Sequence, residues 1–287
     1  MLQALLGITL VVFMVGSLLE VGLRLRLPGA VRALRNLRFV GLSVLWAFVV
    51  GPAFAVLLTK VIPLAEPYAV GMLFLGMAPC APFLPLVSER ARGDLSYVAA
   101  LMLLTAVGTV VYMPLLTPVL VKGFTADAWT IAKPLVLYVT LPMALGIAVR
   151  RAFENFAETA HPLVKKVTAI DTVIMIVILA WLYRADFAGA IGTYAIATQL
   201  VFYSVVAAAA YALAPGLAHS QKSVLALGAC TRNLGAAFAP LVTVPGTDPR
   251  TIAMVALAVP LSVLCAFGAA HLLARRALHL DRAASAA

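Results

Sequence analysis

Apolar runs of membrane-spanning length follow one another along almost the whole of this chain, and they limit what it can fold into. The 287 residues are 64% hydrophobic and 11% charged, with a mean hydropathy of +1.06. Soluble domains carry about 25% charged residues, and no polar block here is long enough to form one. The sequence therefore predicts an all-α polytopic membrane protein, with a single transmembrane domain over residues 1–287 in the lipid bilayer.

A membrane-spanning helix needs about 20 mainly apolar residues, and about nine segments of the chain meet that requirement. The first segment lacks a basic leader and a cleavage site, so it is interpreted as a span and not as a signal peptide. The three cysteines lie in apolar segments without metal-ligand spacing, which predicts neither a disulfide framework nor a metal site. The predicted spans are about 3–23, 37–60, 67–88, 95–121, 132–150, 162–183, 193–215, 222–243 and 251–274.

Basic residues are distributed unevenly between the two sides that these spans define. Fifteen Lys and Arg lie in the first loop, in the loops on its side and near the C-terminus, against five on the other side, Lys122 among them. The positive-inside rule then places the first loop and the C-terminus in the cytoplasm and the N-terminus outside, in a plasma or bacterial inner membrane. It also accounts for the net charge of +10, so nucleic acid is not a predicted partner.

Two of the predicted spans contain residues that interrupt a regular helix. The third contains "MAPCAPFLP", in which Pro79, Pro82 and Pro85 each lack a backbone donor. The eighth contains "LGACTRNLGAAFAP", with Thr231, Arg232 and Asn233 at its centre. Two interrupted spans at corresponding places in two halves indicate an inverted-repeat transporter with its site between them. The first repeat is predicted at about 1–122 and the second at about 130–276, followed by a cytoplasmic tail at 277–287.

Several motifs, in order, resemble the bile acid:sodium symporter family, in the wider group that includes arsenite and auxin carriers. "FMVGSLLEVGLRLRLPGAVRALRNLRFV" is similar to that family's "fGmGLtL" segment and basic loop, and "GMLFLGMAPCAPFLPLVSERARGDLSY" to its first broken helix. "YMPLLTPVL", "TLPMALGIAV" and "QKSV…TRNLGAAFA" resemble later elements, the last of them the second broken helix. The resemblance implies a core domain of spans 2–4 and 7–9, a panel of spans 1, 5 and 6, and two broken helices that cross near the midplane.

This chain departs from the family at the residues that surround sodium in its sodium-coupled members. The family's Ser-Asn pair reads Leu84-Pro85 here, and its Glu-x-x-x-Gln reads Leu227 and Thr231. Thr105 and Thr109 are interpreted as remnants of an ion site. No cofactor is predicted; sodium, a proton and no coupling ion at all stay open as alternatives.

Arg232 lies close to the midplane of its span, about 15 Å along a helix from Lys222. A charge at that depth costs a few kcal/mol and needs a partner or water. We interpret Arg232 either as a cation that binds an anionic substrate or as a built-in replacement for sodium; the alternative is a snorkelling arginine. Further candidate substrate-binding residues are Thr231, Asn233, Cys80, Pro82 and Thr109.

Two acids lie well inside predicted spans, Glu20 and Asp171, both on the panel. We predict that Asp171, or failing that Glu20, pairs with Arg232 in one conformation, and that substrate replaces the acid as counter-ion. Either acid can also carry a coupling proton. The alternative for Glu20 is an i,i+4 pair with Arg24 at the cytoplasmic edge. The four histidines do not converge in the sequence and no role is assigned to them.

The function predicted from these features is secondary active transport of a small organic anion by alternating access, in a monomer or homodimer. Alternatives are a membrane sensor on the same scaffold and a proton-coupled or uniport carrier. No HExxH or GxSxG motif and no converging His/Asp set is present, so enzyme activity is not predicted.

Overall fold

The computed structural model describes residues 2–121, 127–244 and 246–285, and every regular element in them is a helix. Lys122, one of the loop cations used above for orientation, lies outside the described residues. In chain order the elements are α1 (Leu2–Arg24), α2 (Leu27–Leu34), α3 (Leu37–Val44), η1 (Leu45–Val50), α4 (Gly51–Val61), α5 (Glu66–Met77), α6 (Leu84–Arg90), α7 (Leu95–Leu120) and α8 (Ala128–Leu135). They continue with η2 (Val136–Thr140), α9 (Leu141–Ala152), α10 (Glu154–Leu182), α11 (Arg184–Ala190), α12 (Ala195–Ala212), α13 (His219–Cys230), α14 (Leu234–Thr243) and α15 (Pro249–Ser285).

Six continuous helices in the described part of the chain are long and apolar enough to cross a membrane, which confirms a helical membrane protein. The other three predicted spans fall on α5 with α6, on α13 with α14, and on α10, so the number nine stays a prediction. The six are Leu2–Arg24, Leu37–Val61, Leu95–Leu120, Ala128–Ala152, Ala195–Ala212 and Pro249–Arg282.

Several helix limits differ from those predicted by hydropathy. α10 begins at Glu154 and not near residue 162, because polar residues are good helix formers and only end an apolar run. α15 likewise continues through the predicted tail as far as Ser285, where Arg92 Nη1 pairs with Asp281 Oδ2 at 2.8 Å. The short helices α2 and α11 were not predicted, since neither is long enough to span a membrane.

Two of the long helices contain a widened π-helical segment directly before a proline. η1 precedes Gly51-Pro52, and η2 precedes Leu141-Pro142. A proline cannot donate to the carbonyl one turn earlier and its ring needs room there, so the preceding turn widens. The helices Leu37–Val61 and Ala128–Ala152 thereby continue across their prolines without a break.

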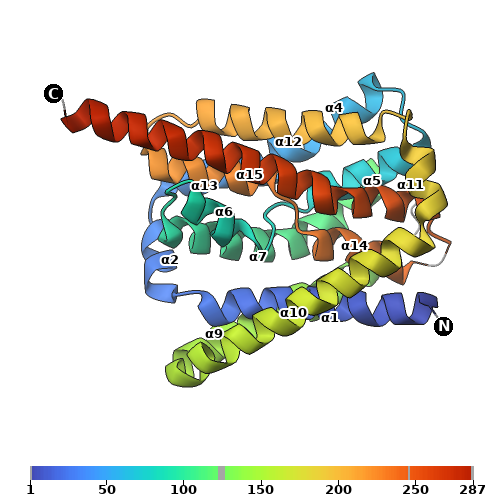
Figure 1. Ribbon diagram of the computed structural model, residues 1–287, viewed down its shortest axis with the longest axis horizontal. Coiled ribbons are helices and arrows are strands. Elements are labelled where there is room, and N and C mark those ends of the chain that lie inside the picture. Colours follow the sequence, from blue (N-terminus) through green and yellow to red (C-terminus); the bar gives the residue numbers. More distant parts are fainter. Residues whose placement is uncertain (1, 122–126, 245, 286–287) are drawn as a thin grey trace.

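The helices form two groups, which Figure 1 shows at opposite edges of the molecule. α1 packs against α9 and α10, along the lower edge of Figure 1; we call these three helices the three-helix layer. α12 lies along the upper edge and packs against α13 and α15, and α15 in turn packs against α5. The interrupted helices α5–α6 and α13–α14 lie between these edges together with α7.

Glycines allow very close backbone contact inside the three-helix layer. A Cβ added at Gly22 of α1 would lie 2.3 Å from the Met143 carbonyl oxygen and 2.9 Å from the Gly146 Cα of α9. A Cβ at Gly146 would lie 2.6 Å from the Leu19 carbonyl oxygen. Since all these neighbours are backbone atoms, α1 and α9 can approach this closely only with glycine on both sides.

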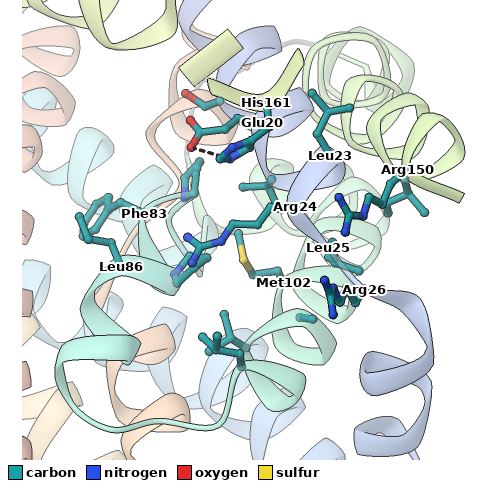
Figure 2. A pocket seen from close by; sticks show the side chains of 18 of the residues that line it. Glu20, Leu23, Arg24, Leu25, Arg26, Phe83, Leu86, Met102, Arg150 and His161 are labelled. Atoms are coloured by element: carbon teal, nitrogen blue, oxygen red, sulfur yellow. Dashed lines mark ion pairs between the residues drawn. The ribbon is translucent and has the colours of Figure 1, made fainter. Parts of the chain in front are cut away.

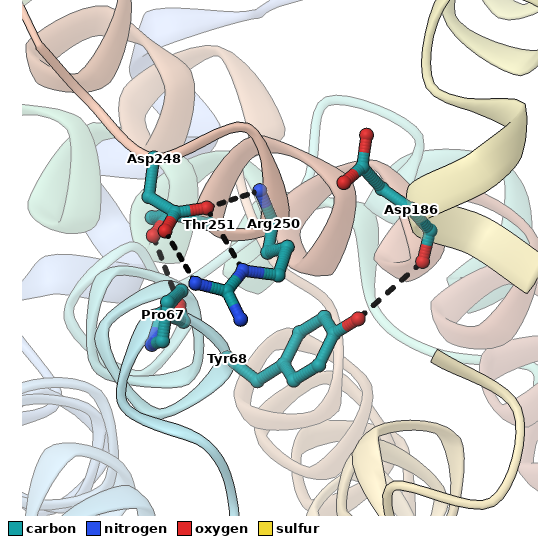
Figure 3. Close-up of polar contacts among 6 residues, drawn as sticks. All are labelled: Pro67, Tyr68, Asp186, Asp248, Arg250 and Thr251. Atoms are coloured by element: carbon teal, nitrogen blue, oxygen red, sulfur yellow. Dashed lines mark hydrogen bonds and ion pairs between the residues drawn. The ribbon is translucent and has the colours of Figure 1, made fainter. Parts of the chain in front are cut away.

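Polar contacts close the end of the molecule at which α5 and α15 begin (Figure 3). The Tyr68 hydroxyl donates to the Asp186 carbonyl oxygen of α11 at 3.4 Å, and the Thr251 hydroxyl donates to the Pro67 carbonyl oxygen at 3.0 Å. Hydrogen bonds from Arg250 hold the pKa of the Asp248 carboxyl below its usual range. These contacts join α5, α11 and α15 at this end.

Candidate functional site

The two interrupted helices cross where their backbones are unwound, at the positions that the sequence predicts. Residues 78–83 separate α5 from α6, and residues 231–233 separate α13 from α14. The two unwound segments run antiparallel and are joined by a bridge between Pro79 and Arg232. Cys80 N donates to Thr231 O at 2.9 Å, and Asn233 N donates to Ala78 O at 2.9 Å. These bonds satisfy backbone groups that lipid could not.

Thr231 and Asn233 serve the backbone of this crossing. The Thr231 hydroxyl accepts a hydrogen bond from Ala81 N at 3.2 Å. Asn233 is the N-cap of α14, and its Oδ1 accepts from Ala236 N at 3.1 Å. Cys80 has a positive φ of 69°, which lets the chain turn between α5 and α6. All three side chains are buried.

Arg232 is fully buried, with an exposed fraction of 0%, and its guanidinium contacts the last turns of two half-helices. Nη1 donates to the Gly76 carbonyl oxygen of α5 at 3.3 Å, and Nη2 donates to the Ala229 carbonyl oxygen of α13. The guanidinium carbon lies 4.7 Å from the centre of the Phe202 ring of α12. The C-terminal ends of helices carry partial negative charge, so a cation between two of them is stabilised electrostatically. Among the described residues, Arg232 therefore has carbonyl dipoles and a π face as its partners, and no carboxylate.

The hydroxyls interpreted as remnants of a sodium site donate their protons to the preceding turn of α7, and the neighbouring family positions Leu84 and Leu227 supply no side-chain oxygen. The Thr105 hydroxyl donates to the Leu101 carbonyl oxygen at 2.8 Å, and the Thr109 hydroxyl donates to the Thr105 carbonyl oxygen at 2.6 Å. Leu84 and Leu227 are fully buried and apolar. No group of three or more His, Cys, Asp or Glu that could hold a metal ion is present among the described residues.

A cavity of about 1760 Å³ separates the three-helix layer from α2, α6 and α7 and reaches the crossing. At its inner end it is bordered by Ala81, Pro82, Phe83, Arg232 and Leu234. The atoms around the Arg232 guanidinium belong to Gly76, Ala229 and Phe202, none of which lines the cavity. The guanidinium thus lies behind the crossing as seen from the cavity.

The predicted substrate-binding residues divide into two sets. Arg232 and Pro82 border the cavity, whereas Cys80, Thr109, Thr231 and Asn233 are buried beside it and do not line it. Thr105 is likewise buried and outside the lining. Within the first set Pro82 is partly exposed and Arg232 is fully buried, so in this conformation a solute in the cavity meets Pro82 directly.

Charged side chains line the outer part of the cavity (Figure 2). The alternative prediction that Glu20 pairs with Arg24, one turn away, is wrong. Arg24 pairs with Glu89 of α6, and Glu20 Oε1 lies 3.6 Å from His161 Nε2 of α10. Arg150 Nη2 pairs with Glu154 at 2.9 Å and Glu158 at 3.1 Å. The pair of Arg24 and Glu89 joins the three-helix layer to an interrupted helix across the cavity, and we call it the mouth pair.

Asp171 and Arg232 are not paired in this conformation. Asp171 does not line the cavity, and its Oδ2 is a buried oxygen without a hydrogen-bond partner in the described residues. Glu20 is the one of the two predicted acids that faces the cavity. The prediction that an acid pairs with Arg232 in another conformation stays a prediction.

Sequence reasoning missed His161 and Glu89. His161 lies outside every motif quoted above, twelve positions after the end of TLPMALGIAV, yet it faces Glu20 because α1 and α10 pack together. The available signal was that the polar residues before the sixth predicted span are good helix formers. They extend α10 back to Glu154 and so place His161 on a helix and not in a loop. Glu89 lies in the quoted motif around the first break, but nothing in its local sequence indicates a partner on α1.

Comparison with known proteins agrees with the resemblance that the motifs carry. The sequence profile of the Sodium Bile acid symporter family matches residues 8–189, which is more than half of the chain. The matched region runs from α1 through the first interrupted helix to α11 and includes the residues of the cavity wall on α1, α6 and α10. Comparison with curated proteins gives no significant match. The chain belongs to the Sodium Bile acid symporter family.

Proposed function

We propose that this protein is a secondary transporter that moves a small organic anion across the membrane by alternating access. The panel, which consists of the three-helix layer with α8 and η2, moves against a core made of the other long helices and the crossing. The observation that carries this proposal is the cavity, which lies between these two groups and ends at the crossing. With the orientation predicted from the loops, the cavity opens to the cytoplasm, and the contacts in Figure 3 close the outer end.

We further propose that Arg232 takes the place of a bound sodium ion, so that sodium is not required. Its guanidinium holds together the C-terminal ends of α5 and α13, which a cation would otherwise have to neutralise. The substrate anion then binds on the cavity side, near Pro82 and the positively charged side chains of the cavity wall. The bilayer is the only other partner proposed.

The test is thermal unfolding of the purified protein with taurocholate, benzoate and pyruvate as probes of different size. We expect at least one of these anions to raise the Tm by the same amount in sodium chloride as in choline chloride, since binding to the folded state stabilises it. That anion is also expected to enter proteoliposomes that contain the protein. Stabilisation that requires sodium would contradict the role given to Arg232. Binding without flux would favour a sensor over a carrier.

Breaking the mouth pair is expected to open the cavity further. Exposed ion pairs contribute about 0.2–1 kcal/mol, so Glu89→Arg should raise access to the cavity by about 1.4- to 5-fold. Access is measured as the rate at which a membrane-impermeant maleimide labels Ser17→Cys in a chain whose three native cysteines are replaced by alanine. Ser17 lines the cavity and is buried.

Two variants complete the experiment on the mouth pair. The double variant Arg24→Glu with Glu89→Arg restores opposite charges and should return the labelling rate to its original value. The control is Asp281→Arg, which breaks another exposed ion pair, with Arg92, that does not border the cavity. Equal labelling of Glu89→Arg and the unchanged protein would show that the mouth pair does not restrict access.

A further inference from the structure

The cavity wall contains an ion pair of a glutamate and a histidine that takes no part in the crossing. Glu20 Oε1 of α1 and His161 Nε2 of α10 are 3.6 Å apart, and Figure 2 shows the two side chains turned toward each other. The side chains are 26% and 25% exposed, and both line the cavity. Among the ion pairs between described residues, this is the one that contains a histidine.

The pair is not needed to hold α1 against α10. These helices already touch closely at Gly16, where an added Cβ would lie 2.3 Å from the Thr168 hydroxyl oxygen. His161 Nε2 makes no hydrogen bond in the described part of the chain, so its contact with Glu20 is electrostatic. An ion pair with this geometry can exchange its partner when another anion enters the cavity.

The other charges around the pair are largely matched with one another. Arg24 of α1 pairs with Glu89 of α6, and Arg150 of α9 pairs with Glu154 and Glu158 of α10. α14 and η2, which also pack against α1, have no charged residue, and the charged residues of α11 are at the other end of α10. The remaining charged residues of the cavity lining are Arg26, Arg151, Lys165 and Arg232.

The chemistry of the pair couples an entering anion to a proton. Histidine is the side chain that ordinarily gains or loses its charge between pH 5 and 8, and as imidazolium it is the counter-ion of the carboxylate beside it. A substrate anion that contacts the same imidazolium comes close to the Glu20 carboxylate. Two anionic groups that share one cation in a partly buried site disfavour each other's ionised form, so the weaker acid of the two takes up a proton.

We propose that Glu20 and His161 form a proton-binding site at which one proton is taken up with each substrate anion, an inference that rests on the proposed function. In the empty cavity, the imidazolium of His161 faces the carboxylate of Glu20. In the loaded cavity, the imidazolium faces the anionic group of the substrate, and Glu20 carries one proton taken from water. The substrate's negative charge and the proton's positive charge cancel, so the loaded cavity has the same net charge as the empty one. The membrane potential therefore does not oppose entry of the anion.

The test uses the purified full chain and whichever of taurocholate, benzoate and pyruvate stabilises it. Isothermal titration calorimetry from pH 5 to 6, where a histidine ordinarily keeps most of its charge, is expected to give a Kd that rises about tenfold, as linkage requires for one proton per anion. Binding in a weakly buffered solution with a pH indicator should take up about one proton per anion at the high end of this range.

Three variants assign the proton to this pair. Glu20→Gln, which mimics the protonated acid, should bind the anion with a Kd that does not rise with pH, and should take up no proton. His161→Gln should weaken binding about tenfold or more, because the counter-ion is lost. Glu158→Gln, a control acid that also lines the cavity, should keep the pH dependence of the unchanged protein.

The possible failures are distinguishable. If none of the three anions stabilises the protein or enters proteoliposomes, the proposed function is wrong and this inference falls with it. If an anion binds with a Kd independent of pH and without proton uptake, the proposed function stands and the proton site is wrong. A pH dependence that persists in Glu20→Gln also overturns the proton site. If that variant does not fold, the proton count of the unchanged protein decides.

Discussion

Arg232→Met is expected to lower the Tm of the purified protein by about 5–10 °C and to reduce the amount of folded protein in the membrane. The change removes both hydrogen bonds of the guanidinium, to the carbonyl oxygens of Gly76 and Ala229. Each orphaned buried carbonyl costs about 1–3 kcal/mol, and about 1 kcal/mol changes the Tm of a chain of this size by about 2–4 °C. The cost of burying the charge itself is recovered, which keeps the loss below the sum of these terms.

The charge and the shape of Arg232 can be tested separately. Arg232→Lys keeps a cation but supplies a single ammonium in place of a planar group with several donors. We therefore expect its Tm to lie between that of Arg232→Met and that of the unchanged protein. Arg232→Ala leaves space between the two helix ends, and millimolar guanidinium chloride should raise its Tm relative to equal choline chloride. Arg32→Met, at an exposed position in α2, is the control and should leave the Tm unchanged within about 2 °C.

A Tm of Arg232→Met equal to that of the unchanged protein would contradict the role given to this arginine. A rise in the Tm of Arg232→Ala with sodium as well as with guanidinium would support the proposal that Arg232 occupies the place of a monovalent cation. The same carbonyl oxygens would then bind either a guanidinium ion or a sodium ion. Rescue by neither would show that the vacated space does not accept a cation.

Gly22→Ala is expected to be the most damaging small substitution in the three-helix layer. The new Cβ would meet the Met143 carbonyl oxygen at 2.3 Å, the Gly146 Cα at 2.9 Å and the Ile147 nitrogen at 3.0 Å. Because these are backbone atoms, one helix has to move as a whole, and overpacking of this kind costs about 1–3 kcal/mol. We expect the Tm to fall by about 3–10 °C.

Gly7→Ala is the matched control, since Gly7 belongs to the same helix and an added Cβ there has nothing within 4 Å. Alanine has the higher helix propensity, by about 1 kcal/mol, so the Tm of Gly7→Ala should stay the same or rise. Gly146→Ala, on the facing helix, should behave like Gly22→Ala. If Gly22→Ala and Gly7→Ala have the same Tm, the close approach of α1 and α9 is not part of the folded state.

The Gly22 experiment also bears on the proposed transport mechanism. A panel that moves as one body needs α1 and α9 to stay in contact while the cavity opens and closes. Loss of their contact should therefore reduce anion flux in proteoliposomes more than it reduces anion binding to the purified protein. Equal losses of binding and flux would indicate general unfolding.

Much of the fold was predictable because it depends on residues that are neighbours in the chain. Membrane-spanning helices follow from apolar length, and the first interruption follows from prolines that lack backbone donors. The second follows from a polar triplet in an apolar segment, and the same reasoning places Arg232 away from both ends of its span. The limits of α10 and α15 were misplaced most, since a helix does not stop where its apolar residues do.

The partners of the charged side chains were not predictable in this way. Glu20 and Arg24 are one helical turn apart, yet each reaches a residue on another helix, His161 and Glu89 respectively. Arg232 was expected near an acid, but its guanidinium meets the Gly76 carbonyl group, which becomes available only because the two interrupted helices cross. Periodicity and composition record which residues are apolar and where a helix breaks, whereas a pairing across helices depends on how those helices pack, and many packings satisfy the same apolar pattern.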